Sequence, residues 1–285
     1  MRFLTDKSIE GALICPICRS AMRVVTNSGA SLFCEGTKKH CYDFSSRGYV
    51  NFMASGYSTS GDSKQAVAAR SAFLNKQFYM PVAEAICDIL NKYLPSRRGL
   101  VVDAGCGEGY YSSKIAEQGY SVFGVDLSKF AVDAAAKRAN ANNTENSFFA
   151  VSSVFDIPFS DGSADAVINV FAPCVEDEYF RLVGNGGIVV VVYAGQKHLM
   201  GLKSAIYDSV RENDGREDLP KNACLLEERR VLFDIEMTSN EDVKNLFAMT
   251  PYYWKTSKKD LEKLEGIKSL KTEIDMVIAV YKNNF

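Results

Sequence analysis

Hydrophobic and polar positions divide the chain into two unequal parts. From Tyr79 onward, short apolar runs alternate with stretches in which apolar residues recur at helical spacing. Strands are predicted over Leu100–Asp103, Ser121–Asp126, Ser147–Val151, Ala164–Phe171 and Ile188–Tyr193, with strand-like stretches at Arg230–Met237 and Ile274–Tyr281. Helices are predicted over Ala83–Tyr93, Tyr110–Gln118, Lys129–Ala139, His198–Val210 and Asp242–Met249. This alternation predicts an α/β fold with a mostly parallel sheet, in which ligands bind at the carboxyl ends of the strands.

The part before Tyr79 has little from which to build a core of its own. Residues 11–50 are short, rich in turn residues and carry four cysteines. The following stretch begins with a Gly-, Ser- and Thr-rich part, expected to be a loop, and continues with a helix predicted over Lys64–Phe73. We therefore expect a small module over residues 1–50, a connector over 51–78 and an α/β domain over 79–285.

A glycine-rich loop follows the first predicted strand. Asp103 ends that strand, and Gly105, Gly107 and Gly109 come next, followed by Tyr110. Glycines let a backbone turn sharply and approach a ligand, because no Cβ intervenes. The dinucleotide fingerprint would need its third glycine at position 110, whereas the spacing D-x-G-x-G-x-G resembles motif I of the class I methyltransferases, whose Rossmann-like domain binds S-adenosylmethionine.

Two further segments fit the same reading. Asp126 ends the next predicted strand, 17 residues after Gly109, where a carboxylate can accept both ribose hydroxyls of an adenosine. The segment from Ser153 to Phe159 resembles the part of this superfamily that packs against adenine. Each segment taken singly also has a simpler interpretation. The glycines are compatible with an ordinary tight turn, Asp126 with a surface acid, and the segment from Ser153 to Phe159 with a plain loop.

The front module has the cysteine spacing of a metal site. Cys15 and Cys18 are two residues apart within a turn, and Cys34, His40 and Cys41 follow. Tetrahedral zinc takes four nitrogen or sulfur ligands from two such clusters, so we expect a structural zinc site formed by Cys15, Cys18, Cys34 and His40. Cys41 stays open as the fourth ligand in place of His40. A segment this small depends on its ion for folding.

Charge and hydropathy add to this picture. Residues 1–98 carry 13 Lys and Arg against 7 Asp and Glu, whereas residues 99–285 carry 20 against 28. A basic front and an acidic body suit a protein that grips a polyanion with one part and a small molecule with the other, although chance asymmetry is the simpler reading. The sequence contains no apolar stretch long enough to span a membrane and no secretory leader, so we expect a cytoplasmic protein.

The chain resembles the bacterial 23S ribosomal RNA guanine-N1 methyltransferases, the RlmA family, over nearly its whole length. The similar strings are His40–Phe44, Gly48–Asn51, Gly61-Asp62, Ala69-Arg70, Phe73-Leu74, Tyr79-x-Pro81, Gly105–Tyr111, Ala172–Cys174, His198–Met200 and Met249–Pro251. Two features depart from the family pattern: the spacing from Cys34 to His40 is long, and the chain is acidic overall.

The resemblance implies what the protein does and which residues do it. The activity would be transfer of a methyl group from S-adenosylmethionine to N1 of a guanine in a 23S ribosomal RNA hairpin, with the zinc module recognising RNA. Cofactor contacts would come from Tyr79, Asp103, Gly105, Gly107, Glu108, Gly109, Tyr110, Asp126, Ser153 and His198. Two of these positions have another interpretation. Tyr79 is also compatible with an aromatic residue at the start of a helix, and His198 with a purely structural residue.

The sequence leaves several points open. Guanine N1 must lose a proton, and Asp156 and Glu178 stand near the Phe171–Cys174 turn as candidates, without a choice of proton acceptor. Cys174 as a nucleophile is disfavoured. A small-molecule methyltransferase whose zinc module acts as a lid is the alternative function, and a cofactor-binding regulator is a third. A homodimer is one option for the oligomeric state.

Overall fold

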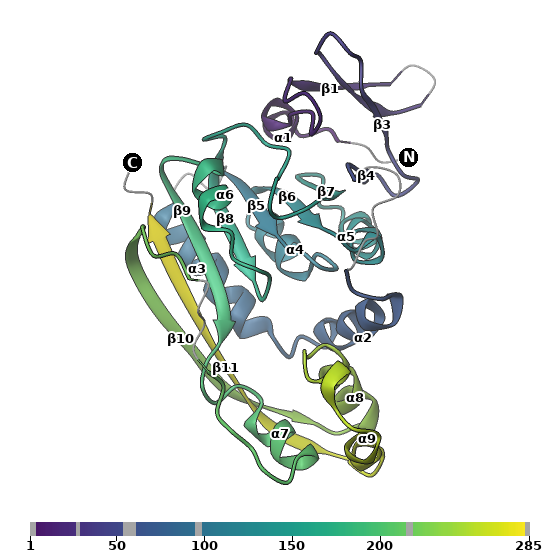
Figure 1. The fold of residues 1–285 in the computed structure, drawn as a ribbon, viewed down its shortest axis with the longest axis vertical. Coiled ribbons are helices and arrows are strands. Elements are labelled where there is room, and N and C mark those ends of the chain that lie inside the picture. The colour runs from purple at the N-terminus through teal and green to yellow at the C-terminus, as the bar shows by residue number, and fades with distance from the viewer. Residues whose placement is uncertain (1–3, 27–28, 54–60, 95–98, 215–218, 283–285) are drawn as a thin grey trace.

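An eight-stranded sheet forms the centre of the computed structural model, which describes residues 4–26, 29–53, 61–94, 99–214 and 219–282 apart from the side chain of Trp254 (Figure 1). The strand order is β10-β11-β9-β8-β5-β6-β7-β4. Among the described strands of this sheet, β11 alone runs opposite to all the others, so the predicted mostly parallel sheet is confirmed. The strands are β4 Val50–Asn51, β5 Leu100–Ala104, β6 Ser121–Asp126, β7 Ser147–Val151, β8 Ala164–Val170, β9 Val183–Ala194, β10 Cys224–Met237 and β11 Leu270–Lys282.

Helices α3 (Met80–Tyr93), α4 (Tyr110–Glu117) and α5 (Lys129–Ala141) pack side by side on one face of the sheet (Figure 1). Farther along the chain, α7 (Met200–Ile206) packs on β11. This last helix is shorter than the predicted span from His198 to Val210. It starts after Leu199, whose φ is +59°, and ends at Tyr207, where the backbone becomes extended.

The opposite face is covered in an unusual way. The chain passes from β7 to β8 through residues 152–163 without forming a helix, so this crossover leaves apolar sheet surface bare. The N-terminal module fills that place with α1 (Lys7–Ala12) and a three-stranded antiparallel sheet of β1 (Met22–Val25), β2 (Ser31–Cys34) and β3 (Cys41–Asp43). Helix α6 (Glu176–Leu182), which was not predicted, covers the rest.

The module and the sheet share one hydrophobic core. Leu13 of the module pairs its backbone with Phe159, and the Phe159 ring stacks on Phe123 of β6 at 4.3 Å between ring centroids. All three side chains are almost wholly buried. Burial of apolar surface is the main favourable term in folding, so the module is held to the domain by the same interaction that forms the domain's core.

A second layer lies across the carboxyl ends of the strands. Helix α2 (Lys64–Asn75), the predicted connector helix, packs against α8 (Asn240–Ala248), and Lys76 forms an ion pair of 2.6 Å with Asp242. The short helices η1 (Tyr253–Lys255) and α9 (Lys258–Glu265) follow α8. Most of the predicted connector loop, residues 54–60, lies outside the described residues. None of the described helices has the length and apolar composition needed to cross a bilayer.

Candidate active site and metal centre

A cavity of about 630 Å³ lies between the carboxyl ends of the strands and the α2–α8 layer. Eight of the residues expected to contact a cofactor line it: Tyr79, Asp103, Gly105, Gly107, Glu108, Tyr110, Asp126 and His198. Gly109 and Ser153 are not among the lining residues. Gly109 caps α4 at its N-terminus, and the Ser153 hydroxyl accepts a hydrogen bond from the Phe155 amide at 3.1 Å.

The glycine loop is packed too tightly for side chains. Gly105 and Gly107 both have positive φ, +85° and +54°. A Cβ at Gly105 would lie 2.4 Å from the Cβ of Ala172, and one at Gly107 would lie 3.0 Å from Nη2 of Arg70. The two glycines therefore bring bare backbone to the cavity wall.

Arg70 connects α2 to this loop and was not identified from the sequence as a site residue. Its Nε donates to the Glu108 carboxylate at 2.5 Å, and Nη1 pairs with Asp62. Burial opposes its charge, but Glu108 and Asp62 raise the Arg70 pKa above the ordinary value, so it stays a cation. Nη2 is buried and has no hydrogen-bond partner among the residues that the structure describes. A buried cationic donor beside a cavity is suited to an anionic group such as a carboxylate.

Two carboxylates at strand ends face the same cavity. Asp126 accepts hydrogen bonds from the amides of Gly107 (3.0 Å) and Ser128 (2.7 Å), which fix its orientation, and burial raises its pKa. Asp103 accepts from the Ser112 hydroxyl at 2.5 Å. Burial raises the pKa of Asp103 to about 7 in spite of that bond, with the charges of Asp126 and Glu108 adding to the effect.

His198 sits at the far wall in a defined tautomer. Its Nδ1 accepts a hydrogen bond from the Asp275 amide at 3.3 Å, so the proton is on Nε2. Burial lowers the His198 pKa to about 4, which keeps the ring neutral near pH 7. The ring contacts Tyr79 edge to face, at 6.4 Å between centroids.

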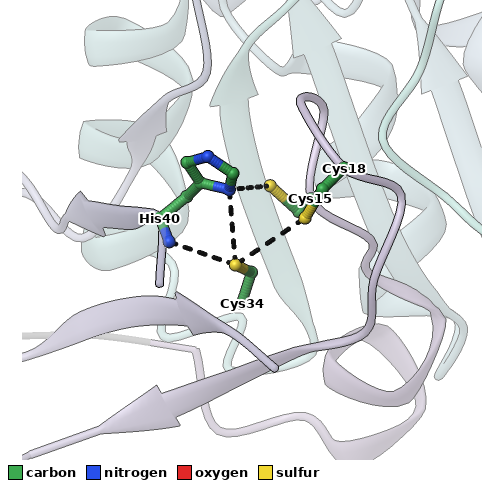
Figure 2. Close-up of side chains that lie close together, drawn as sticks. All are labelled: Cys15, Cys18, Cys34 and His40. Atoms are coloured by element: carbon green, nitrogen blue, oxygen red, sulfur yellow. Dashed lines mark hydrogen bonds between the residues drawn. The ribbon is translucent and has the colours of Figure 1, made fainter. Parts of the chain in front are cut away.

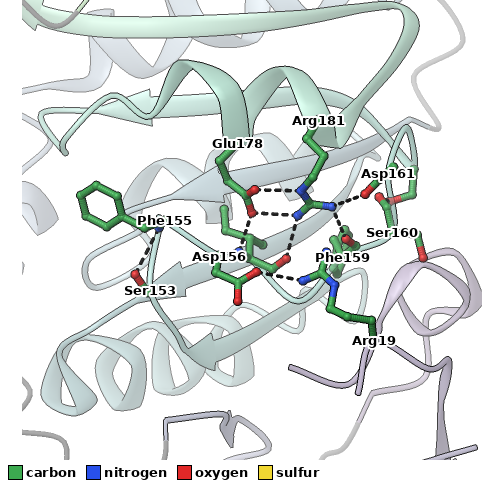
Figure 3. A network of polar contacts seen from close by, with 11 residues as sticks. Arg19, Ser153, Phe155, Asp156, Phe159, Ser160, Asp161, Glu178 and Arg181 are labelled. Atoms are coloured by element: carbon green, nitrogen blue, oxygen red, sulfur yellow. Dashed lines mark hydrogen bonds and ion pairs between the residues drawn. The ribbon is translucent and has the colours of Figure 1, made fainter. Parts of the chain in front are cut away.

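Only some of the residues expected to surround the substrate base, near the turn after β8, lie at the cavity. Phe171, Ala172 and Pro173 line the cavity, whereas Cys174, Asp156 and Glu178 do not. Glu178 accepts from the Ile157 amide at 2.6 Å and pairs with Arg181 (Figure 3). Asp156 pairs with Arg19 at 2.8 Å. Both carboxylates are therefore engaged in holding segment 152–163 in place.

The four expected metal ligands come together in the module (Figure 2). Their ligand atoms all lie within 4.8 Å of one another. His40 Nδ1 is 3.4 Å from Sγ of Cys15 and 3.4 Å from Sγ of Cys34, and Cys18 and Cys34 are 3.8 Å apart. Zinc–ligand bonds of about 2.0–2.3 Å in a tetrahedron give similar separations. Cys41 is exposed on β3 and lies outside the group.

The turn that carries Cys15 and Cys18 touches the loop that lines the cavity. Val154 and Phe155 form part of the cavity wall. A few residues later, the Ile14 amide donates to the Pro158 carbonyl at 3.0 Å, and the Ser160 amide donates to the Ala12 carbonyl at 2.9 Å. With the Arg19–Asp156 ion pair, these contacts tie the turn that carries Cys15 and Cys18 to the cavity (Figure 3).

Comparison with known proteins identifies the family. The family model described as a methyltransferase domain matches residues 101–184. The 23S rRNA (guanine(748)-N(1))-methyltransferase of Streptomyces fradiae is 33% identical over 204 residues, which cover 70% of this chain and 69% of that protein. The Bacillus subtilis (strain 168) protein YxjB, named provisionally as a 23S rRNA (guanine-N(1)-)-methyltransferase, is 28% identical over 278 residues, which cover 93% of this chain and 95% of YxjB.

Solved structures agree on the fold. A protein from Anaeromyxobacter dehalogenans, named provisionally as a type II methyltransferase, superposes with a TM-score of 0.52 at 19% identity, over 70% of this chain and 95% of that one. The predicted class I methyltransferase fold is thus confirmed, together with the resemblance stated above. The chain belongs to the family of 23S rRNA guanine-N1 methyltransferases.

Proposed function

We propose that the protein transfers a methyl group from S-adenosylmethionine to N1 of a guanine in a 23S ribosomal RNA hairpin. The observation that carries the proposal is the match to curated guanine-N1 methyltransferases along both parts of the chain, module and domain. The glycine-walled cavity at the strand ends supports it, because its volume of about 630 Å³ lies in the range typical of small-molecule and cofactor sites.

The cavity residues divide naturally over the parts of the cofactor. Asp126 is oriented to accept the ribose hydroxyls, with Leu127, Val154 and Phe155 as apolar neighbours for adenine. The Arg70 Nη2, which lies beside Gly107, suits the methionine carboxylate, and Asp103 suits the ammonium group. Gly105 and Gly107 have no Cβ, so the backbone can approach the part of S-adenosylmethionine between its ribose and its charged end groups.

Catalysis in this proposal rests on positioning. When bound, S-adenosylmethionine supplies a methyl group that is already activated for transfer. The protein has to hold the acceptor nitrogen in line with it and exclude water, and such orientation accounts for a large part of many rate enhancements. A neutral His198 is compatible with a bound S-adenosylmethionine, because an imidazolium at the same wall would repel the positive sulfonium.

We propose further that Cys15, Cys18, Cys34 and His40 hold a structural zinc ion. The chemistry of the donor set supports this, since three thiols and one imidazole nitrogen form a closed tetrahedral site. The ion would fix the turn that carries Arg19, and lysines such as Lys38 and Lys39 on the same module are placed to meet RNA phosphates.

The first prediction tests the function itself. Purified protein with tritiated S-adenosylmethionine should label 23S ribosomal RNA from a strain lacking this activity, and nucleoside mapping should yield N1-methylguanosine as the only product. Asp126→Ala should abolish labelling at low cofactor concentration, since charge-assisted hydrogen bonds are each worth roughly 1.5–3 kcal/mol. Methylation of a metabolite without labelling of RNA would instead support the small-molecule alternative.

The second prediction concerns Asp103 and pH. Because its pKa is raised to about 7, the folded protein binds a proton that the unfolded chain releases between about pH 4 and 7, and stability falls as pH rises through that window. Asp103→Asn should therefore stabilise the ligand-free protein at pH 8 by a few kcal/mol, at about 1.4 kcal/mol per pKa unit, and weaken S-adenosylmethionine binding. Urea unfolding and calorimetry at pH 5 and 8 measure both effects.

The control for Asp103 is Asp88→Asn, because the Asp88 side chain is 71% exposed. This variant should change neither stability nor affinity. Equal stability of wild type and Asp103→Asn at pH 8 would contradict the assigned charge state of Asp103.

The third prediction identifies the fourth metal ligand. Protein purified without added metal should contain one zinc per chain by elemental analysis, and His40→Ala should lose most of it, because three thiolates leave the tetrahedron open. Cys41→Ser should keep the full complement. The reverse pattern would make Cys41 the ligand, and zinc-free wild type would refute the metal site.

A further inference from the structure

An exposed aromatic ring stands at the mouth of the cavity, directly after β8. Phe171 is 48% exposed although it belongs to the cavity wall. Its φ is +58°, a backbone conformation that bulky residues rarely adopt and that tends to occur at functional sites. A phenylalanine held at this angle without being buried does not contribute to the core in the usual way, so the geometry calls for another use of the ring.

The turn that carries Phe171 is held on both sides. The Tyr179 hydroxyl donates to the Pro173 carbonyl at 2.7 Å, and the buried Asn169 amide donates to the same carbonyl at 3.0 Å. The Phe171 amide donates to the Val192 carbonyl at 3.1 Å. Ala172 packs directly on Gly105 of the cofactor loop. The backbone that carries the ring is therefore fixed by hydrogen bonds beside the proposed methyl donor.

One face of the ring is already backed by a second ring. Phe171 and His198 stack with 5.9 Å between centroids and 29° between planes. His198 is itself nearly buried and is fixed by the Asp275 amide. Since His198 supports the ring from within the wall, the exposed part of Phe171 is directed to whatever enters the mouth.

We propose that Phe171 is the platform on which the target guanine stacks when it is presented to the methyl donor. This inference rests on the proposed function. An enzyme that modifies the pairing edge of a base must act on a base taken out of its helix, and unstacked bases are commonly received by aromatic side chains. A ring on a hydrogen-bonded turn, backed by His198, offers a base a stacking partner at low ordering cost.

Three substitutions test the platform in the full-length, metal-loaded protein. Phe171→Ala and Phe171→Gly remove the ring, and glycine also accepts the positive φ, so that loss of backbone order does not imitate loss of stacking. Loss of one base–aromatic stacking contact lowers affinity by about 5- to 150-fold. We therefore expect kcat/KM for RNA to fall by a factor within that range in both variants. Phe171→Tyr should restore it to within about threefold.

Two further measurements separate stacking from other roles. The affinity for S-adenosylmethionine, measured by calorimetry, should stay within about twofold in all three variants. In RNA carrying 2-aminopurine at the mapped guanine, emission from the complex should be higher with Phe171→Ala than with wild type, because stacking quenches this base. Phe130→Ala is the matched control, since Phe130 is also exposed, at 52%, but does not line the cavity.

The outcomes are distinguishable. If wild type transfers no methyl group to RNA, the proposed function and the platform both fail. If wild type is active and Phe171→Ala matches it in kcat/KM, or loses cofactor affinity to the same extent as activity, the platform alone is overturned. A loss of equal size in Phe130→Ala would likewise overturn it.

Discussion

The apolar face left bare by the β7–β8 crossover is the constraint on which the rest of the structure depends. No helix forms within residues 152–163, so the sheet can be sealed only by another part of the chain, and the N-terminal module does this. Phe159 sits between the two, stacked on Phe123 and paired with Leu13. The N-terminal module is thereby built into the hydrophobic core, and it cannot be lost without exposing the sheet.

This arrangement also determines the shape of the cofactor cavity. Segment 152–163 supplies Val154 and Phe155 to the cavity wall. The same segment is bonded to Ile14 and Arg19, next to and within the turn that carries Cys15 and Cys18. On the other side, Arg70 joins α2 to the glycine loop. The cavity is thus bounded in part by α2, which precedes the α/β domain in sequence, and by segment 152–163, which the module contacts. The two halves of the protein, expected from the sequence to act separately, are mechanically connected at the site.

The local features of the fold could be predicted from sequence because their causes are local. Glycine spacing, buried apolar runs and clustered cysteines predicted the glycine loop that lines the cavity, the central strands and the Cys3His group. Features that depend on contacts between segments far apart in the sequence could not be predicted in this way. Strand β4 has two residues and exists only beside β7, and the role of Arg70 depends on α2 reaching a loop 38 residues later. Helix α6 had a recognisable start in three consecutive acids, Glu176, Asp177 and Glu178, which was overlooked.

Amide hydrogen exchange of the metal-loaded and the chelated protein tests most directly whether the module holds segment 152–163, which contributes to the cavity wall, in place. Loss of metal should loosen the turn that carries Cys15 and Cys18, so the amides of Ile14 and Ser160, which bond the module to segment 152–163, should lose protection while those in the centre of β9 keep it. S-adenosylmethionine should then bind more weakly. If these two amides exchange at the same rate with and without metal, after elemental analysis has verified its removal, the coupling between module and cavity does not exist.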